Sequence, residues 1–154
     1  MREETKRKLV AAAIRARHQA VAPYSGFPVG AALLSAGGRI IGGANVESVS
    51  YGLTCCAERV ALFKALTEGV RTFVAVALVA RFPKGPTPCG ACRQLLAEFA
   101  PRAIVLLADS ARPSRIRQFA VTDLLPDAFS DWRSGSRKSN RITARRARSN
   151  RQRK

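Results

Sequence analysis

The 154-residue sequence predicts an α/β protein with three layers, α/β/α, around a mixed central sheet of about five strands. Amphipathic helical segments alternate with short apolar runs, which favours layers of helices on a sheet. Two of the apolar runs are continuous, as expected for strands buried on both faces. A Gly-containing tight turn joins the first two expected strands into a hairpin.

The N-terminal part predicts a helix followed by this hairpin. The helix is expected over residues 3–20, where apolar side chains recur on one face, and Pro23 marks the region that ends it. Val29–Ser35 is the first expected strand, and residues 39–46 form its hairpin partner.

The remainder predicts helices that alternate with strands. A helix is expected over residues 56–68, with Thr54 as its cap, and Phe73–Ala80 is an apolar run typical of a central strand. The elements after it are a helix over 91–99, a buried strand over 104–108, a weaker strand over 115–120 and a short closing element over 124–129. We expect crossover helices to link the strands that follow the hairpin.

The net charge of +17 is unevenly distributed along the chain. Residues 133–154 contain ten Lys and Arg residues and no Asp or Glu, which leaves +7 for residues 1–132. We therefore expect one folded domain at 1–132 and a basic, disordered tail at 133–154. The tail is most simply a solvated extension; a weak contact with RNA, DNA or anionic lipid through phosphate electrostatics is the alternative.

The sequence gives no sign of a membrane protein. No apolar stretch reaches the roughly 18–20 residues of a membrane span, and the charged N-terminus lacks the features of a signal peptide. We therefore expect a cytoplasmic protein without a membrane partner. In that compartment the four cysteines indicate metal binding or redox chemistry instead of a disulfide framework.

The cysteines lie at the starts of two expected helices. A helix N-terminus stabilises a thiolate, and thiolates gathered there can bind zinc. Cys89 and Cys92 have the C-x2-C spacing of two ligands from one loop, and a third sulfur would leave one tetrahedral position for water. A redox pair remains an alternative. A structural four-thiolate site is less favoured, because the adjacent Cys55 and Cys56 would point in different directions.

Glu58 favours a catalytic zinc site over a structural one. A carboxylate two residues after a ligand can take a proton from zinc-bound water and return it to a substrate as a general acid. Arg59 could donate to the thiolate sulfurs and withdraw some of their negative charge. Without the neighbouring cysteines, Glu58 would simply be a charged residue in the first turn of a helix, and Arg59 would be a residue of a surface ion pair.

The motifs CAE at 56–58 and PCGACRQ at 88–94 together resemble the zinc signature of the cytidine deaminases. The likeness extends to YSGFPVGAAL at 24–33, NVE at 45–47, SYGL at 50–53 and LLPDAF at 124–129, in the family's order and spacing. It implies a cytidine deaminase-like catalytic domain at 1–132. The implied reaction, part of pyrimidine salvage, is hydrolytic deamination of cytidine and 2′-deoxycytidine to uridine and 2′-deoxyuridine with release of ammonia.

The resemblance also implies roles for individual residues. It implies that Cys56, Cys89 and Cys92 bind one Zn²⁺ per chain and that Glu58 is the proton shuttle. Cys55 matches a position where the family needs no ligand.

Outside the metal centre the resemblance implies a substrate site shared between subunits. Phe27 packs against the pyrimidine, and Asn45 and Glu47 bind the ribose, notably its 3′-hydroxyl. Phe129 reaches into the site of a neighbouring subunit in a homotetramer, and Tyr51 supports that region. From the residues alone, Asn45 and Glu47 at i and i+2 share one side of a strand end, and Phe27 would more simply be a core residue.

Three rival functions stay open. The basic tail suggests a deaminase that acts on cytosine within a polynucleotide, and a non-catalytic zinc or nucleic-acid-binding module is a second possibility. A deaminase of a cytosine-nucleoside antibiotic is the third, although such an enzyme need not keep the Asn-x-Glu pair. His18 is the single histidine, so no H-x-E motif accompanies Glu58.

Overall fold

The computed structural model describes residues 1–129, and the tail and domain boundary expected beyond residue 132 lie outside them. A five-stranded sheet has the order β2-β1-β3-β4-β5. The strands are β1 (Val29–Ser35), β2 (Ile40–Ala44), β3 (Phe73–Ala80), β4 (Ile104–Asp109) and β5 (Arg112–Ala120). β3 and β4 are parallel and the other neighbours are antiparallel, so the predicted mixed sheet is confirmed.

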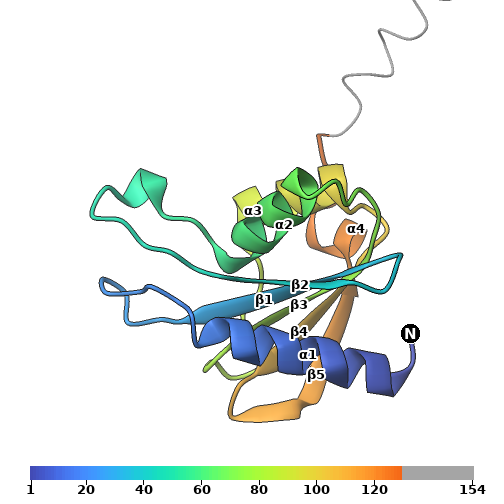
Figure 1. Ribbon diagram of the computed structural model, residues 1–154, viewed down its shortest axis with the longest axis horizontal. Helices are drawn as coiled ribbons and strands as arrows, with labels where there is room; N and C mark the ends of the chain where they lie inside the picture. The colour runs from blue at the N-terminus through green and yellow to red at the C-terminus, as the bar shows by residue number, and fades with distance from the viewer. Residues whose placement is uncertain (130–154) are drawn as a thin grey trace, which may run out of the picture.

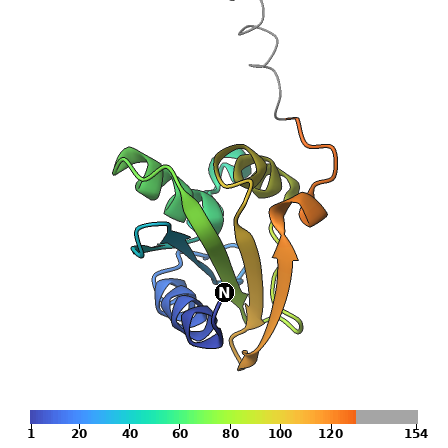
Figure 2. The ribbon, with the colours of Figure 1, turned by 90° about the vertical axis from the view of Figure 1, so that its right-hand side faces the viewer.

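Helices cover both faces of this sheet and complete the three predicted layers (Figures 1 and 2). They are α1 (Glu3–Arg17) on one face, and α2 (Ala57–Thr67), α3 (Gly90–Phe99) and the short α4 (Val121–Leu124) on the other. A 3₁₀ turn, η1 (Tyr51–Leu53), lies in the loop between β2 and α2. Within residues 1–129, none of the helices has both the length and the apolar character that crossing a bilayer requires.

The two continuous apolar runs form the centre of the sheet, as predicted. In β3, Val76 and Leu78 pack in the core under α2 and α3, whereas Ala77 and Val79 pack toward α1. Strand β4 divides its side chains between the same two cores. Each strand is apolar on both faces because a helical layer covers each face.

Three expectations about helix boundaries were wrong. The first helix ends at Arg17, because the N–H groups of residues 18–20 bond to carbonyls three residues back in a tightened final turn. The N-cap of α2 is Cys56, whereas the Thr54 hydroxyl accepts the Ser48 N–H at 3.1 Å. The closing element is helical over Val121–Leu124, and Pro126 disfavours its continuation.

The expectation of crossover helices holds for the step from β3 to β4 and fails for the next one. Helix α3 connects β3 to β4, but only Ser110 and Ala111 separate β4 from the longer β5. The Asp109 carboxylate accepts the Ala111 N–H at 2.9 Å, a local bond that favours a tight turn. Strand β5 therefore returns antiparallel to β4 and forms the edge of the sheet (Figure 2).

Gly43 allows α2 to lie directly on β2. A Cβ atom at this position would lie 2.7 Å from the Ala57 carbonyl oxygen and closer still to the Ala61 nitrogen. These are backbone atoms of the helix, so they cannot move aside as a flexible side chain could. The close approach fixes the position of the first turn of α2.

We predict that Gly43→Ala destabilises the protein by about 1–3 kcal/mol, because the methyl group forces α2 away from the sheet. Urea unfolding of the full chain followed by circular dichroism measures this. Gly37→Ala is the matched control, because its added methyl would have the Ser35 hydroxyl as nearest neighbour at 3.9 Å. Equal stability of the two variants would contradict the proposed contact.

Candidate metal centre

Two helix N-termini converge at one end of the sheet. Strands β2 and β3 run in the same direction because each is antiparallel to β1, and each is followed by a helix on the same face. Cys56 is the N-cap of α2 and Cys89 the N-cap of α3. Topology thus brings together residues that are 33 positions apart in the sequence.

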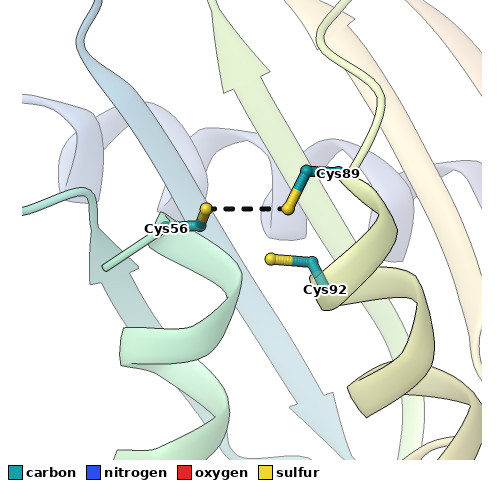
Figure 3. Close-up of side chains that lie close together, drawn as sticks. All are labelled: Cys56, Cys89 and Cys92. Carbon is teal, nitrogen blue, oxygen red and sulfur yellow. Dashed lines mark hydrogen bonds between the residues drawn. The ribbon is translucent and has the colours of Figure 1, made fainter. Parts of the chain in front are cut away.

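Cys56, Cys89 and Cys92 point toward one another between these helix ends (Figure 3). Their Sγ atoms all lie within 4.8 Å of one another, and those of Cys56 and Cys89 are 3.9 Å apart. Cys92 is buried in the first turn of α3, whereas Cys89 is exposed. The three sulfurs predicted from the sequence therefore form one group, open on the side of Cys89.

This group fits a zinc ion. Tetrahedral Zn–S bonds of about 2.3 Å place two sulfurs about 3.8 Å apart, close to the separation of Cys56 and Cys89. Cys55 is not part of the group, so the described residues do not form a four-thiolate site. Its backbone instead pairs with Val46.

The electrostatic surroundings favour thiolate at Cys56. A hydrogen bond from the Cys92 thiol lowers the pKa of Cys56 to about 5, and the same interaction raises the pKa of Cys92. Arg59 Nη2 lies 3.8 Å from the Cys56 sulfur and 2.5 Å from the Thr54 carbonyl oxygen. The guanidinium thus contacts a sulfur, as expected from the sequence.

Glu58 is a buried carboxyl group beside the sulfurs. It lies in the first turn of α2, the residue is only 6% exposed, and burial raises its pKa to about 7. None of the ion pairs in the described residues involves it. A buried, unpaired acid that titrates near neutrality beside a metal-binding group is suited to proton transfer.

Asn45 and Glu47 hold the loop that carries Phe27. Asn45 is buried, and its amide accepts the Val29 N–H at 2.8 Å and donates to the Phe27 carbonyl at 3.1 Å. The Glu47 carboxylate accepts backbone N–H bonds from Tyr24 and Ser25 at 3.0 and 3.1 Å and bonds the Ser25 hydroxyl. These bonds, chiefly that of the Ser25 side chain, lower the pKa of Glu47.

A cavity of about 300 Å³ lies beside this loop. Its lining residues are Tyr24, Ser25, Glu47, Tyr51 and Thr54. Among the described residues, this lining contains one carboxylate and no Lys or Arg. Thr54 lies between the cavity and the sulfur group. It lines the cavity, and its carbonyl accepts a hydrogen bond from Arg59, which contacts the Cys56 sulfur.

The structure adds Phe82, which the sequence reasoning missed. Phe27 is 38% exposed and so is not the core residue that its sequence context suggested. The Phe82 ring packs edge-on against it, with ring centroids 6.2 Å apart. Val29 pairs with Ala80, so the chain two residues before β1 meets the chain two residues after β3. The sequence signal that could have identified Phe82 is its position as an aromatic residue in the Pro- and Gly-rich loop before PCGAC.

Phe129 does not enter the sulfur group of its own chain. The residue is 73% exposed, and its carbonyl accepts a hydrogen bond from Gln94 at 2.7 Å. Tyr51 is similarly exposed.

Known proteins share both the sequence pattern and the fold. The family model described as the cytidine and deoxycytidylate deaminase zinc-binding region matches residues 3–108, which include the three cysteines and Glu58. The chain belongs to this deaminase family.

Individual relatives agree with this assignment. The chain is 50% identical to the cytidine deaminase of Halalkalibacterium halodurans over 121 residues, which cover 79% of this chain and 91% of the relative. The crystal structure of cytidine deaminase from Burkholderia pseudomallei superposes with a TM-score of 0.76 at 47% identity, covering 79% of this chain and 97% of that one. The cytidine deaminase structure from Mycobacterium tuberculosis gives 0.67 at 40% identity, with 80% and 95% covered.

We predict that Cys56→Ser lowers the zinc content of the purified full chain well below one per chain, because it removes one of the three converging sulfurs. Cys55→Ser is the matched control on the adjacent residue and should keep its zinc. Elemental analysis by plasma emission measures both. Loss of zinc from Cys55→Ser but not from Cys56→Ser would show that Cys55, and not Cys56, binds the metal.

Proposed function

We propose that this chain is a zinc-dependent cytidine deaminase that converts cytidine and 2′-deoxycytidine to the corresponding uridines and releases ammonia, a step of pyrimidine salvage. The observation that carries the proposal is the buried Glu58 beside three converging sulfurs. The similarity to cytidine deaminases along four-fifths of the chain supports the same reaction.

Three side chains hold the metal in this proposal: Cys56, Cys89 and Cys92, for one zinc per chain. When bound, zinc supplies a Lewis acid that lowers the pKa of water toward neutrality. Arg59 donates to the Cys56 sulfur and so reduces the negative charge of the thiolate group. The four free cysteines are compatible with the cytoplasmic location expected from the sequence.

Glu58 moves the protons of the reaction. As an oxygen from water attacks C4 of the cytosine ring, the carboxylate takes one water proton and delivers it to N3. It then transfers the second water proton to the departing amine, so that uridine and ammonia leave. A pKa near 7 allows the same carboxyl group to accept and donate within one cycle.

The cavity beside Glu47 is suited to an uncharged sugar. A hydroxyl group can donate to the Glu47 carboxylate, whereas a 5′-phosphate there would face a negative charge with no Lys or Arg among the described lining residues. This favours a nucleoside over the deoxycytidylate that the family's description also names. Asn45 contributes by holding the Phe27 carbonyl, and thus the loop.

Aromatic residues complete the base site. Phe27 presents its ring to the pyrimidine, with Phe82 supporting it edge-on. Phe129 and Tyr51 are exposed. In the proposed homotetramer these side chains contact neighbouring subunits. Such an assembly would bury large apolar side chains that a monomer exposes to water.

We predict that wild-type protein releases ammonia from cytidine and that Glu58→Gln lowers kcat by about 100- to 10,000-fold while zinc stays bound, because the amide cannot shuttle protons. Ultraviolet absorbance follows cytosine loss, and elemental analysis follows zinc. Glu98→Gln, on the exposed part of α3, is the control and should retain activity.

An active Glu58→Gln enzyme would contradict the role of Glu58. A zinc-loaded wild type that deaminates cytosine in single-stranded RNA faster than free cytidine would replace the nucleoside with a polynucleotide substrate. Zinc binding without turnover of either substrate would favour a non-catalytic module.

We predict that Phe82→Ala raises KM for cytidine about two- to tenfold with a smaller change in kcat, because Phe27 loses its edge-on support. Steady-state kinetics separate the two parameters. Phe82→Tyr should restore KM, and Phe63→Ala, which removes an exposed ring from α2, should leave it unchanged. A normal KM in Phe82→Ala would mean that Phe27 holds its position without this contact.

A further inference from the structure

A group of positive charges lies along the outer edge of the sheet, on β5 and on the loop after β3 that also carries Phe82. Five exposed basic residues form it, and we name them the basic edge: Arg81, Lys84, Arg112, Arg115 and Arg117. Three come from β5, and two from the loop that follows β3. The cavity near Glu47 is lined by none of them.

Strand pairing brings these two segments together. Ala80 pairs with Asp109 in β4, and Asp109 pairs with Arg112 in β5, so the end of β3 and the start of β5 share one end of the sheet. The Ser110 N–H donates to the Ala80 carbonyl at 2.9 Å. Farther along β5, Arg117 Nη1 lies 3.4 Å from the Lys84 carbonyl oxygen.

The charge of the basic edge is not neutralised within the described residues. Their three ion pairs involve Lys6, Lys8 and Arg39 on other parts of the surface. Asp109 lies opposite Arg112 in the strand pairing but forms no ion pair with it, and its carboxylate accepts the Ala111 N–H. Five positive charges therefore face solvent together.

Protection of an exposed strand edge explains only part of this pattern. Charged residues on β5 do discourage pairing with another sheet. That role does not require Arg81 and Lys84, which belong to a different segment and extend the charge beyond β5. Basic residues on two neighbouring segments are instead the pattern expected of a surface that contacts several phosphate groups.

We propose that the basic edge binds the phosphodiester backbone of a nucleic acid, independently of base sequence. Arg115 and Arg117 lie on one face of β5 about 7 Å apart, comparable to the spacing of neighbouring phosphates on an extended strand. The Arg117 guanidinium lies over the Phe119 ring at 4.9 Å, which limits its freedom before binding. The ten basic residues in segment 133–154 add charge of the same sign.

The test compares two double variants of the full chain. Arg112→Gln/Arg115→Gln removes two charges from the basic edge, at side chains with no hydrogen bond among the described residues. Arg15→Gln/Lys64→Gln removes two charges from a groove along β2, at the opposite edge of the sheet. Both variants have the same net charge and an intact tail.

Fluorescence anisotropy with a labelled single-stranded RNA, repeated between about 50 and 200 mM salt, measures affinity and its salt dependence. We expect the basic-edge variant to bind at least tenfold more weakly at about 0.1 M salt, with a salt slope smaller by about 1.4, since each lost phosphate contact contributes about 0.7. The groove variant should bind like wild type. Duplex DNA as a second probe distinguishes a shared backbone site from one that requires a single strand.

Three outcomes would overturn the proposal. Equal losses in both variants would mean that net charge alone attracts RNA. No loss in the basic-edge variant would place binding elsewhere on the chain. Impaired binding to phosphatidylglycerol vesicles with normal RNA binding would make the edge a membrane contact. Cytidine turnover and thermal unfolding of each variant check that the protein remains folded.

Discussion

The pairing of β1 with two antiparallel neighbours is the constraint on which the rest of the site depends. It gives β2 and β3 the same direction, so the helices that follow them start at the same end of the sheet. Cys56 and Cys89 meet there, and the same register brings Phe27 and Phe82 into contact. One pairing pattern thus positions both the sulfur group and the aromatic pair.

The site combines groups with opposite requirements for solvent. Glu58 needs burial to raise its pKa, whereas a metal group that receives substrate must have an open side. The first turns of α2 and α3 meet both requirements, because Glu58 and Cys92 face inward while Cys89 is exposed. Gly43 keeps α2 close enough to the sheet for that burial.

Much of the site could be predicted from sequence because its signals are local. The apolar runs of β3 and β4, the C-x2-C motif and the position of Glu58 each depend on a few neighbouring residues. The bonds of Asn45 to the Phe27 loop and the contact between Phe82 and Phe27 could not be predicted in this way. They depend on strand register, which joins residues distant in sequence.

The hydrogen bond from Gln94 to the Phe129 carbonyl has a practical consequence. It fastens the end of the described domain to α3, two residues along the helix from Cys92. A protein fused to a chain shortened near this point would therefore begin beside α3, in the helical layer that carries the metal centre. Fusion at Met1 would place the added mass at the start of α1, on the other face of the sheet.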